Sequence, residues 1–232
     1  MIYPSLWLAH ARARSALNGY PLYDVPHKRA ERTLSMEQAQ ENYAYFLSCK
    51  ASRLTFFQAW LRRNFRVVLS IDGAGLLALN AWVKHYGGGL IDDDPFQATT
   101  FDSYSPIWTR EYAGYNVMID IGIFLGEYLI SKRPHLRWQF HLGYALAPAA
   151  SKEMTSHHRP IIGGFPRGWV HDVLGQGYGS VAGSRDASHI GHNPVLATPD
   201  GLTSRCRASL HLANVADGSE PFIFGDYSNE PI

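Results

Sequence analysis

Residues 119–130 read IDIGIFLGEYLI, and apolar side chains occupy nearly the whole circumference of the helix that this stretch predicts. We expect that helix to cover residues 110–132, because Pro134 follows and cannot continue it. A helix that is apolar on every side is buried, so it should be the longest helix and the centre of the fold. Gly122 and Gly126 lie one turn apart and each costs about 1 kcal/mol relative to alanine. Close approach of a neighbouring backbone should compensate for that cost.

Several helices are expected before this central one. A first helix should cover residues 5–18, and Ser35 begins a capping-box pattern for the next. Ser52 is expected to cap a separate helix that follows. Asp72 should cap another, which the glycines 87–89 end. The first part of the chain is therefore predicted to be mainly helical.

After Pro134 the apolar period changes from that of a helix to that of a strand. Residues 136–142 alternate between apolar and polar side chains, and residues 160–165 form a second short apolar run. Eight glycines fall among the 29 residues 163–191, which favours irregular loops over long helices. Residues 208–215 fit a helix and a strand equally well.

The composition is that of a globular chain. Its 232 residues are enough to bury a sizeable core, and 46% hydrophobic with 18% charged residues excludes a disordered protein. We predict an α+β fold in one domain, residues 1–232. Residues 1–133 should be mainly helical, and residues 134–232 should form a small sheet with long glycine-rich loops.

The net charge of +1 argues against a nucleic-acid or membrane-surface partner, but its distribution is uneven. Residues 1–66 carry ten Lys and Arg against four Asp and Glu, a net of +6. Residues 67–127 carry two against eight, or −6, and residues 128–232 carry nine against eight, or +1. The simplest interpretation is that the first two segments attract each other. An acidic patch for a basic partner is the alternative.

The sequence predicts a soluble, cytoplasmic protein. No basic segment followed by a long apolar run begins the chain, so no signal peptide is expected. The most apolar window, residues 117–130, has only 14 residues and contains Asp120 and Glu127, which is too short and too charged for a membrane span. Cys49 and Cys206 are expected to be reduced thiols and not part of a disulfide scaffold or a zinc site.

Residues 188–194 read SHIGHNP and contain the letters HIGH, the ATP-binding signature of class I aminoacyl-tRNA synthetases. Only 40 residues follow His192, too few for the rest of such a domain, and no lysine-rich loop follows. The neighbouring Gly, Ser, Asn and Pro residues favour a loop. The glycine run at 175–180 lacks the GxGxxG spacing of a dinucleotide site. We expect no nucleotide and no other cofactor.

Histidines offer one hypothesis for chemistry. His189 and His192 are spaced to supply two ligands to a metal ion, and His171 or Asp172 would supply a third. Nothing in the sequence fixes their geometry, and histidines in loops are usually solvated. No metal is therefore expected.

A pair of carboxylates offers another hypothesis. Asp120 and Glu127 are seven residues apart and share one face of the central helix. Paired carboxylates in an apolar setting can supply acid and base catalysis. We favour the alternative that each of them pairs with a basic side chain or lies on a narrow polar stripe of an otherwise buried helix.

The order of segments over roughly residues 40–165 resembles that of bacterial immunity-type proteins. These proteins are encoded beside polymorphic toxins such as Rhs and type VI secretion effectors. The resemblance is carried by packing motifs after an aromatic helix: Leu76-x-x-Leu79-x-x-Trp82-Val83, Ile119-Asp120-x-Gly122-x-x-x-Gly126-Glu127-x-Leu129-Ile130, Pro134-x-Leu136-x-Trp138 and Pro160-x-Ile162-x-Gly164-Phe165.

The resemblance implies a non-catalytic protein that binds and neutralises a cognate toxin by occluding its active site. The acidic loop of Asp92, Asp93 and Asp94 is the natural candidate for a basic toxin surface, with His189 and His192 as further candidates for partner binding. The alternative is a metal- or carboxylate-dependent hydrolase that uses the C-terminal histidines or the two carboxylates of the central helix. A structural module of a secretion assembly is a third possibility.

Overall fold

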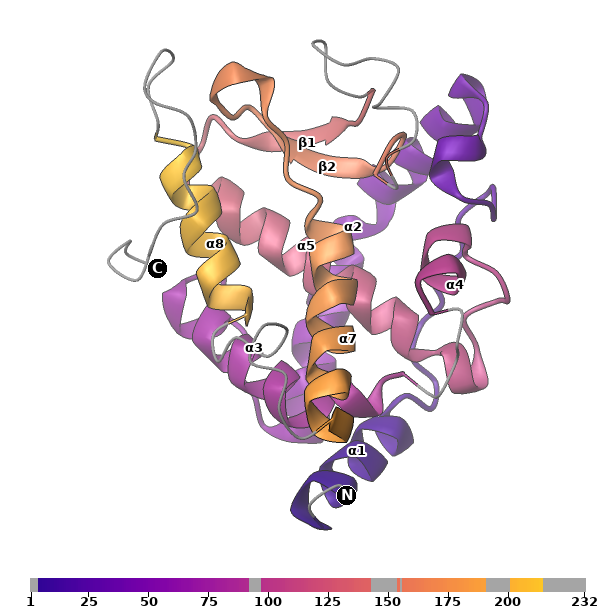
Figure 1. Cartoon of the computed structure of the whole chain (residues 1–232), viewed down its shortest axis with the longest axis vertical. Helices are drawn as coiled ribbons and strands as arrows, with labels where there is room; N and C mark the ends of the chain where they lie inside the picture. The colour runs from indigo at the N-terminus through magenta and orange to yellow at the C-terminus, as the bar shows by residue number, and fades with distance from the viewer. Residues whose placement is uncertain (1–3, 92–96, 143–153, 155, 191–200, 215–232) are drawn as a thin grey trace.

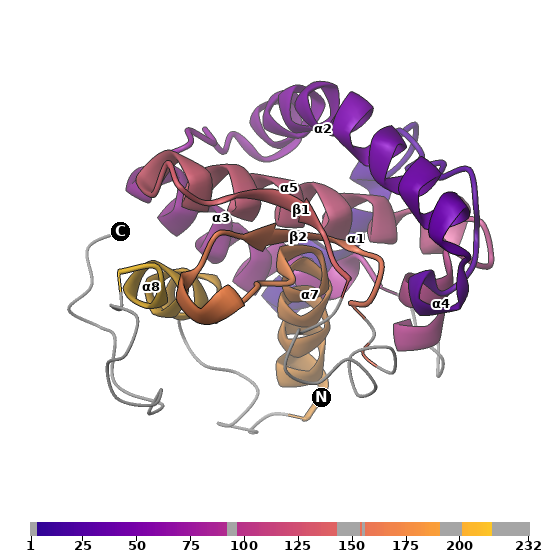
Figure 2. The same cartoon turned by 90° about the horizontal axis from the view of Figure 1, so that it is seen from above.

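Helix α5, Gly114–Lys132, is the centre of the fold in the computed structural model. Every residue from Gly114 to Gly126 is buried, which confirms the prediction from the apolar pattern. In Figure 2 it runs between α2 on one side and α7 and α8 on the other. It is shorter than predicted, because a separate turn at Arg110–Tyr112 precedes it.

The structure describes residues 4–91, 97–142, 154, 156–190 and 201–214. In these ranges it is an α+β fold, mainly helical with one small antiparallel sheet, as predicted (Figure 1). The main elements are α1 (Pro4–Ala16), α2 (Met36–Phe65), α3 (Gly73–Tyr86), α4 (Gln97–Ser103), α5, β1 (Arg137–Phe140), β2 (Pro160–Gly163), α7 (Val173–Ile190) and α8 (Gly201–Leu212). Short 3-10 turns are η1 (Glu31–Thr33), η2 (Gly87–Gly89), η3 (Arg110–Tyr112) and η4 (Pro166–Gly168).

Helix α2 is one helix of 30 residues where the sequence predicted two, and it is longer than α5. Its capping box is present: Ser35 accepts a hydrogen bond from the backbone of Gln38, whose side chain accepts one from Ser35. Ser52 does not cap a second helix. Its hydroxyl donates to the carbonyl of Cys49 (2.8 Å), a bond that a serine inside a helix can make without interrupting it.

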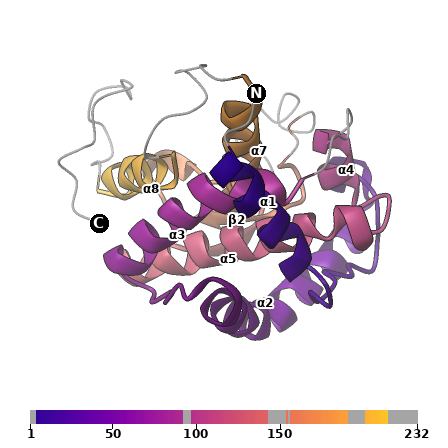
Figure 3. The same ribbon diagram turned by 90° about the horizontal axis from the view of Figure 1, so that it is seen from below.

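Helix α3 begins and ends where the sequence predicted. Asp72 Oδ1 accepts a hydrogen bond from the backbone N–H of Gly75 (2.8 Å), and η2 ends the helix. The glycines of η2 are buried because α1 crosses them (Figure 3). A Cβ added at Gly89 would lie 2.6 Å from Cα of His10, so no larger residue fits there.

The two predicted strands form an antiparallel pair that lies over α5 (Figure 1). Arg137 pairs with Gly163, and Phe140 pairs with Pro160. The indole of Trp138 lies against Gly126 of α5, where an added Cβ would approach a ring carbon to 2.2 Å. Gly126 therefore makes room for a side chain, and not for the backbone that the sequence analysis expected.

Helix α7 corrects the prediction that residues 163–191 form irregular loops. Gly177 of α7 and Gly122 of α5 lie where the two helices cross. A Cβ added at Gly122 would lie 2.7 Å from Cα of Leu174, and one at Gly177 would lie 2.4 Å from a backbone oxygen of α5. The predicted close backbone approach at Gly122 is confirmed. Contact between the two helices compensates for the low helix propensity of glycine.

Helix α8 resolves the ambiguity for residues 208–212, which are helical, and with α7 it makes the described C-terminal part more helical than predicted. The backbone N–H of Leu202 donates to Asn80 Oδ1 of α3 (3.1 Å), which ties the start of α8 to the N-terminal helices. Cys206 of α8 and Cys49 of α2 are free thiols, as predicted.

One helical stretch among the described residues, Arg110–Lys132, is long and apolar enough to cross a membrane by length and composition alone. Its best window has a mean hydropathy of 1.2, and 89% of that window is buried inside the protein. Such burial is that of the core helix of a soluble protein. The stretch is therefore assigned to the core.

Candidate functional site

Asp120, the first of the two carboxylates on α5, is fully buried in an ion pair with Arg53 of α2. Its Oδ1 lies 2.6 Å from Arg53 Nε, and its Oδ2 lies 2.9 Å from Arg53 Nη2. The hydroxyl of Tyr20 also donates to Oδ2 (2.6 Å). Burial raises the pKa of Asp120 to about 6, against the opposing effect of Arg53. This carboxylate joins α2, α5 and the segment after α1.

Glu127, the second carboxylate, has its own partners. Its Oε1 accepts from Lys50 Nζ (2.5 Å) and from the indole N–H of Trp138 (2.8 Å). The prediction that each carboxylate pairs with a basic side chain is therefore confirmed. Both bases lie in the positive segment 1–66 and both carboxylates in the negative segment 67–127, which confirms that these two segments attract each other.

A larger charged cluster surrounds Arg159, just before β2. Its Nε lies 2.5 Å from Glu31 Oε2, its Nη2 lies 2.8 Å from Asp102 Oδ1, and its Nη1 lies 2.9 Å from Asp172 Oδ2. Burial raises the pKa of Glu31, and Arg159 and the hydroxyl of Tyr104 oppose that rise. The Arg159 cluster joins η1, α4, β2 and the start of α7. Sequence analysis missed it, because its members are far apart in the chain.

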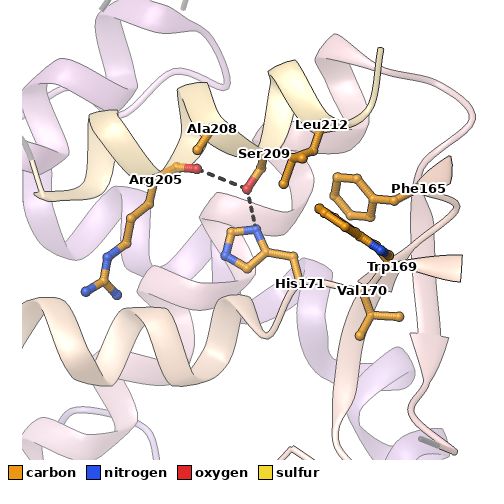
Figure 4. Close-up of a pocket in the computed structure, with 8 residues that line it drawn as sticks. All are labelled: Phe165, Trp169, Val170, His171, Arg205, Ala208, Ser209 and Leu212. Atoms are coloured by element: carbon orange, nitrogen blue, oxygen red, sulfur yellow. Dashed lines mark hydrogen bonds between the residues drawn. The ribbon is translucent and has the colours of Figure 1, made fainter. Parts of the chain in front are cut away.

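A pocket of about 240 Å³ opens between α8 and the segment that follows β2 (Figure 4). Four of its residues lie one or two turns apart on one face of α8, and the others come from the segment between β2 and α7. We call it the His171 pocket. It is lined by Phe165, Trp169, Val170, His171, Arg205, Ala208, Ser209 and Leu212.

His171 and Ser209 form the polar wall of the His171 pocket. Ser209 Oγ lies 2.6 Å from His171 Nδ1 and 3.0 Å from the backbone oxygen of Arg205 (Figure 4). Burial lowers the pKa of His171 to about 4, so the imidazole is neutral at pH 7. The hydroxyl has one hydrogen, which it donates either to His171 or to the helix backbone.

The structure brings together few of the residues that the sequence nominated. Asp92, Asp93, Asp94 and His192 lie outside the described residues. His189 lies in the last turn of α7, so the HIGH letters begin in a helix and not in the predicted loop. Within the described ranges, no group of three or more His, Cys, Asp or Glu side chains is arranged to hold a metal ion.

His171 and Asp172 were proposed as alternative third ligands of a metal ion, and these two neighbours point to different partners. His171 pairs with Ser209 of α8, whereas Asp172 binds Arg159 and accepts a hydrogen bond from the N–H of Gly175 (2.8 Å). The glycine run at 175–180 belongs to α7, and its carboxylate cap explains why a helix starts there. Ser209 carried no signal in the sequence, because it meets His171 only through the packing of α8.

Comparison with protein-family models, with curated proteins and with solved structures finds no match. The site is therefore characterised by its geometry. Two arginine environments stand out among the described residues: Arg159 is enclosed by carboxylates, whereas Arg205 is an exposed cation at the edge of a largely apolar pocket.

Proposed function

We propose that the chain is a cytoplasmic immunity-type protein that binds a cognate bacterial toxin and neutralises it by covering the toxin's active site. The observation that carries this proposal is the structural role of Asp120 and Glu127. Both carboxylates are engaged in ion pairs that hold the helices together. Removing one partner of a buried pair is strongly destabilising, so these groups serve the scaffold.

The packing of the motifs that resemble immunity-type proteins also supports the proposal. The resemblance rests on aliphatic, aromatic and glycine residues spread over about 125 positions. In the fold they meet: Trp138 of β1 and Ile162 of β2 both contact Gly126 of α5. Such motifs preserve a rigid core, and a binding protein can then vary its surface around that core.

In this proposal the acidic residues Asp92, Asp93 and Asp94 attract a basic surface of the toxin. Complementary charge accelerates encounter and selects the partner, whereas buried aromatic anchors supply most of the affinity. His189 and His192 are further candidates for contact. The proposal thus needs tight binding and no bond-making step in this chain.

The test is a pull-down of this protein against the products of the flanking genes, followed by a growth-protection assay with the toxin. We expect capture of one product and survival of cells that make both proteins. Charge reversal at Asp93→Lys and Asp94→Lys should slow association about tenfold at low salt. The matched control reverses Glu41 and Glu111, two exposed acidic residues elsewhere, and should leave the rate unchanged. Failure of the protein to bind or protect contradicts the proposal.

A hydrolase that uses His171 is the second candidate, and the 2.6 Å contact between Ser209 Oγ and His171 Nδ1 favours it. In that reaction His171 takes the hydroxyl proton while the Ser209 oxygen attacks the carbonyl carbon of an ester. Collapse of the tetrahedral intermediate breaks the bond to the alcohol, which leaves with the proton from His171, and water then hydrolyses the acyl group from Ser209. Labelling with a fluorophosphonate, compared between the wild type and Ser209→Ala, distinguishes the two candidates. Labelling that depends on Ser209 supports the hydrolase, and its absence supports the binding protein. Metal analysis of the purified protein tests the metal-dependent form of the hydrolase.

A further inference from the structure

The two ends of the His171 pocket differ in chemistry. Arg205, Ser209 and Leu212 lie on one face of α8, and seven residues separate the first from the last, roughly 10 Å along the helix axis. Leu212 lies near Phe165 and Trp169, so this end is apolar and partly aromatic (Figure 4). In the same view Arg205 extends past His171 on the side away from Trp169.

Among the described residues that line the pocket, Arg205 alone carries a formal charge at neutral pH. His171 is neutral there, because burial lowers its pKa to about 4. The neighbouring carboxylate, Asp172, is bound to Arg159 at 2.9 Å. The guanidinium of Arg205 makes no hydrogen bond or ion pair with any other residue that the structure describes. A planar guanidinium without such a partner is suited to bind a carboxylate in a bidentate manner.

The size of the pocket limits what the apolar end can hold. An apolar cavity of about 150 Å³ accommodates benzene, and the His171 pocket measures about 240 Å³. The space therefore fits one aromatic ring with a short chain. Aromatic rings pack favourably against Phe165 and Trp169 in offset or edge-to-face arrangements.

We propose that the His171 pocket binds a small arylalkanoic acid, with its ring between Trp169 and Leu212 and its carboxylate on Arg205. The alkyl chain passes along the wall made by Ser209 and His171. This small-molecule site uses none of the residues proposed for toxin binding, and it holds whether or not the chain is an immunity protein. It requires no chemistry at Ser209.

Isothermal titration calorimetry of the full chain with 4-phenylbutyrate tests this proposal. We expect saturable binding at one site, and about tenfold weaker binding of the uncharged 4-phenylbutyramide, because it loses the charge-assisted hydrogen bonds. The variant Arg205→Gln should lose the same tenfold for the acid and bind the amide as the wild type does. Ala208→Phe fills the pocket and should abolish binding of both compounds.

The matched control is Arg63→Gln, which removes an exposed arginine of α2 and should bind the acid as the wild type does. Circular dichroism of each variant shows that it is folded before titration. Equal affinity for the acid and the amide, an unchanged affinity of Arg205→Gln, or no saturable binding to the folded wild type would each overturn the proposal. A peptide that ends in phenylalanine, added as a competitor of 4-phenylbutyrate, distinguishes a free acid from a protein C-terminus as the occupant. If the peptide competes in the wild type but not in Arg205→Gln, its carboxylate binds in the same way as that of the acid. Competition that persists in Arg205→Gln contradicts the proposal.

Discussion

Arg159 and Arg205 lie on either side of the start of α7, and their surroundings differ in exposure to solvent and in carboxylate partners. Arg159 is 3% exposed and binds three carboxylates from three separate elements. Arg205 is exposed beside a pocket and has no carboxylate partner among the described residues. The first side of α7 is closed by charge pairing and close packing with α5, whereas the second side, toward α8, is open to a ligand. Substitutions on the two sides should therefore differ in effect.

The largest difference is expected between Arg159→Met and Arg205→Met. Arg159→Met leaves the buried carboxylate of Glu31 beside Asp102 and Asp172 without a cation, which should lower the free energy of unfolding by about 3–5 kcal/mol. Arg205→Met removes an exposed charge and should change it by less than about 0.5 kcal/mol. Urea unfolding of both variants measures the difference. Equal changes in the free energy of unfolding of the two variants would contradict the difference between the two arginine environments.

Two titrating groups, Asp120 in the packed core between α2 and α5 and His171 in the pocket, should respond to pH with opposite sign. The pKa of Asp120 is raised to about 6 in the folded protein, so its contribution to stability increases as pH falls from about 6 toward 4. The pKa of His171 is lowered to about 4, so the unfolded chain binds protons first and its contribution decreases as pH falls from about 6.5 to 4. Each effect is on the order of 2 kcal/mol.

Unfolding of the wild type, Asp120→Asn and His171→Gln across this pH range separates the two contributions. Relative to the wild type, Asp120→Asn should lose stability increasingly as pH falls, because it lacks the protonation that favours folding. His171→Gln should gain relative stability over the same range. A parallel pH dependence in all three proteins would contradict both assignments.

The smallest difference is expected between two glycines of α7 that lie two residues apart. Gly177 faces α5, where an added Cβ would lie 2.4 Å from the backbone oxygen of Met118, so Gly177→Ala should cost about 1–3 kcal/mol through overpacking. Gly179 faces α8, where an added Cβ would lie 3.6 Å from Arg205 Nη1, an ordinary contact. Gly179→Ala should therefore stabilise the helix by about 0.5–1 kcal/mol. Thermal unfolding of the two variants tests whether α7 has one tightly packed face toward α5 and one looser face toward α8. Equal changes in stability would contradict that difference.

Local patterns were sufficient for part of the fold. The apolar stretch 119–130 identified the buried central helix, because burial on all sides requires apolar residues on all sides. The caps at Ser35 and Asp72 depend on backbone groups within three residues, so the sequence predicts them correctly. Ser52 shows the limit of such reasoning: the same residue type inside a helix bonds its own backbone, and only the continuation of α2 distinguishes the two cases.

The candidate site was less predictable than the fold. Of the nominated residues that the structure describes, only His171 lines the pocket, and its partner Ser209 is 38 residues away. The partners of Arg159 are 13, 57 and 128 residues away, so no local spacing marks the cluster. Motif searches detect ligands that share one loop or one helix face, and this site is assembled from several elements.

What the sequence by itself determined is the set of features whose stability is local: the buried helix α5, the capped start of α2, the capped helix α3 and the two strands. Only the tertiary structure decided that the glycine-rich segment becomes α7, since the cost of glycine in a helix is offset there by contact with a helix distant in sequence. It also decided which arginine is enclosed and which remains open. Charge pairing depends on distance in space, and amino-acid order alone does not specify that distance.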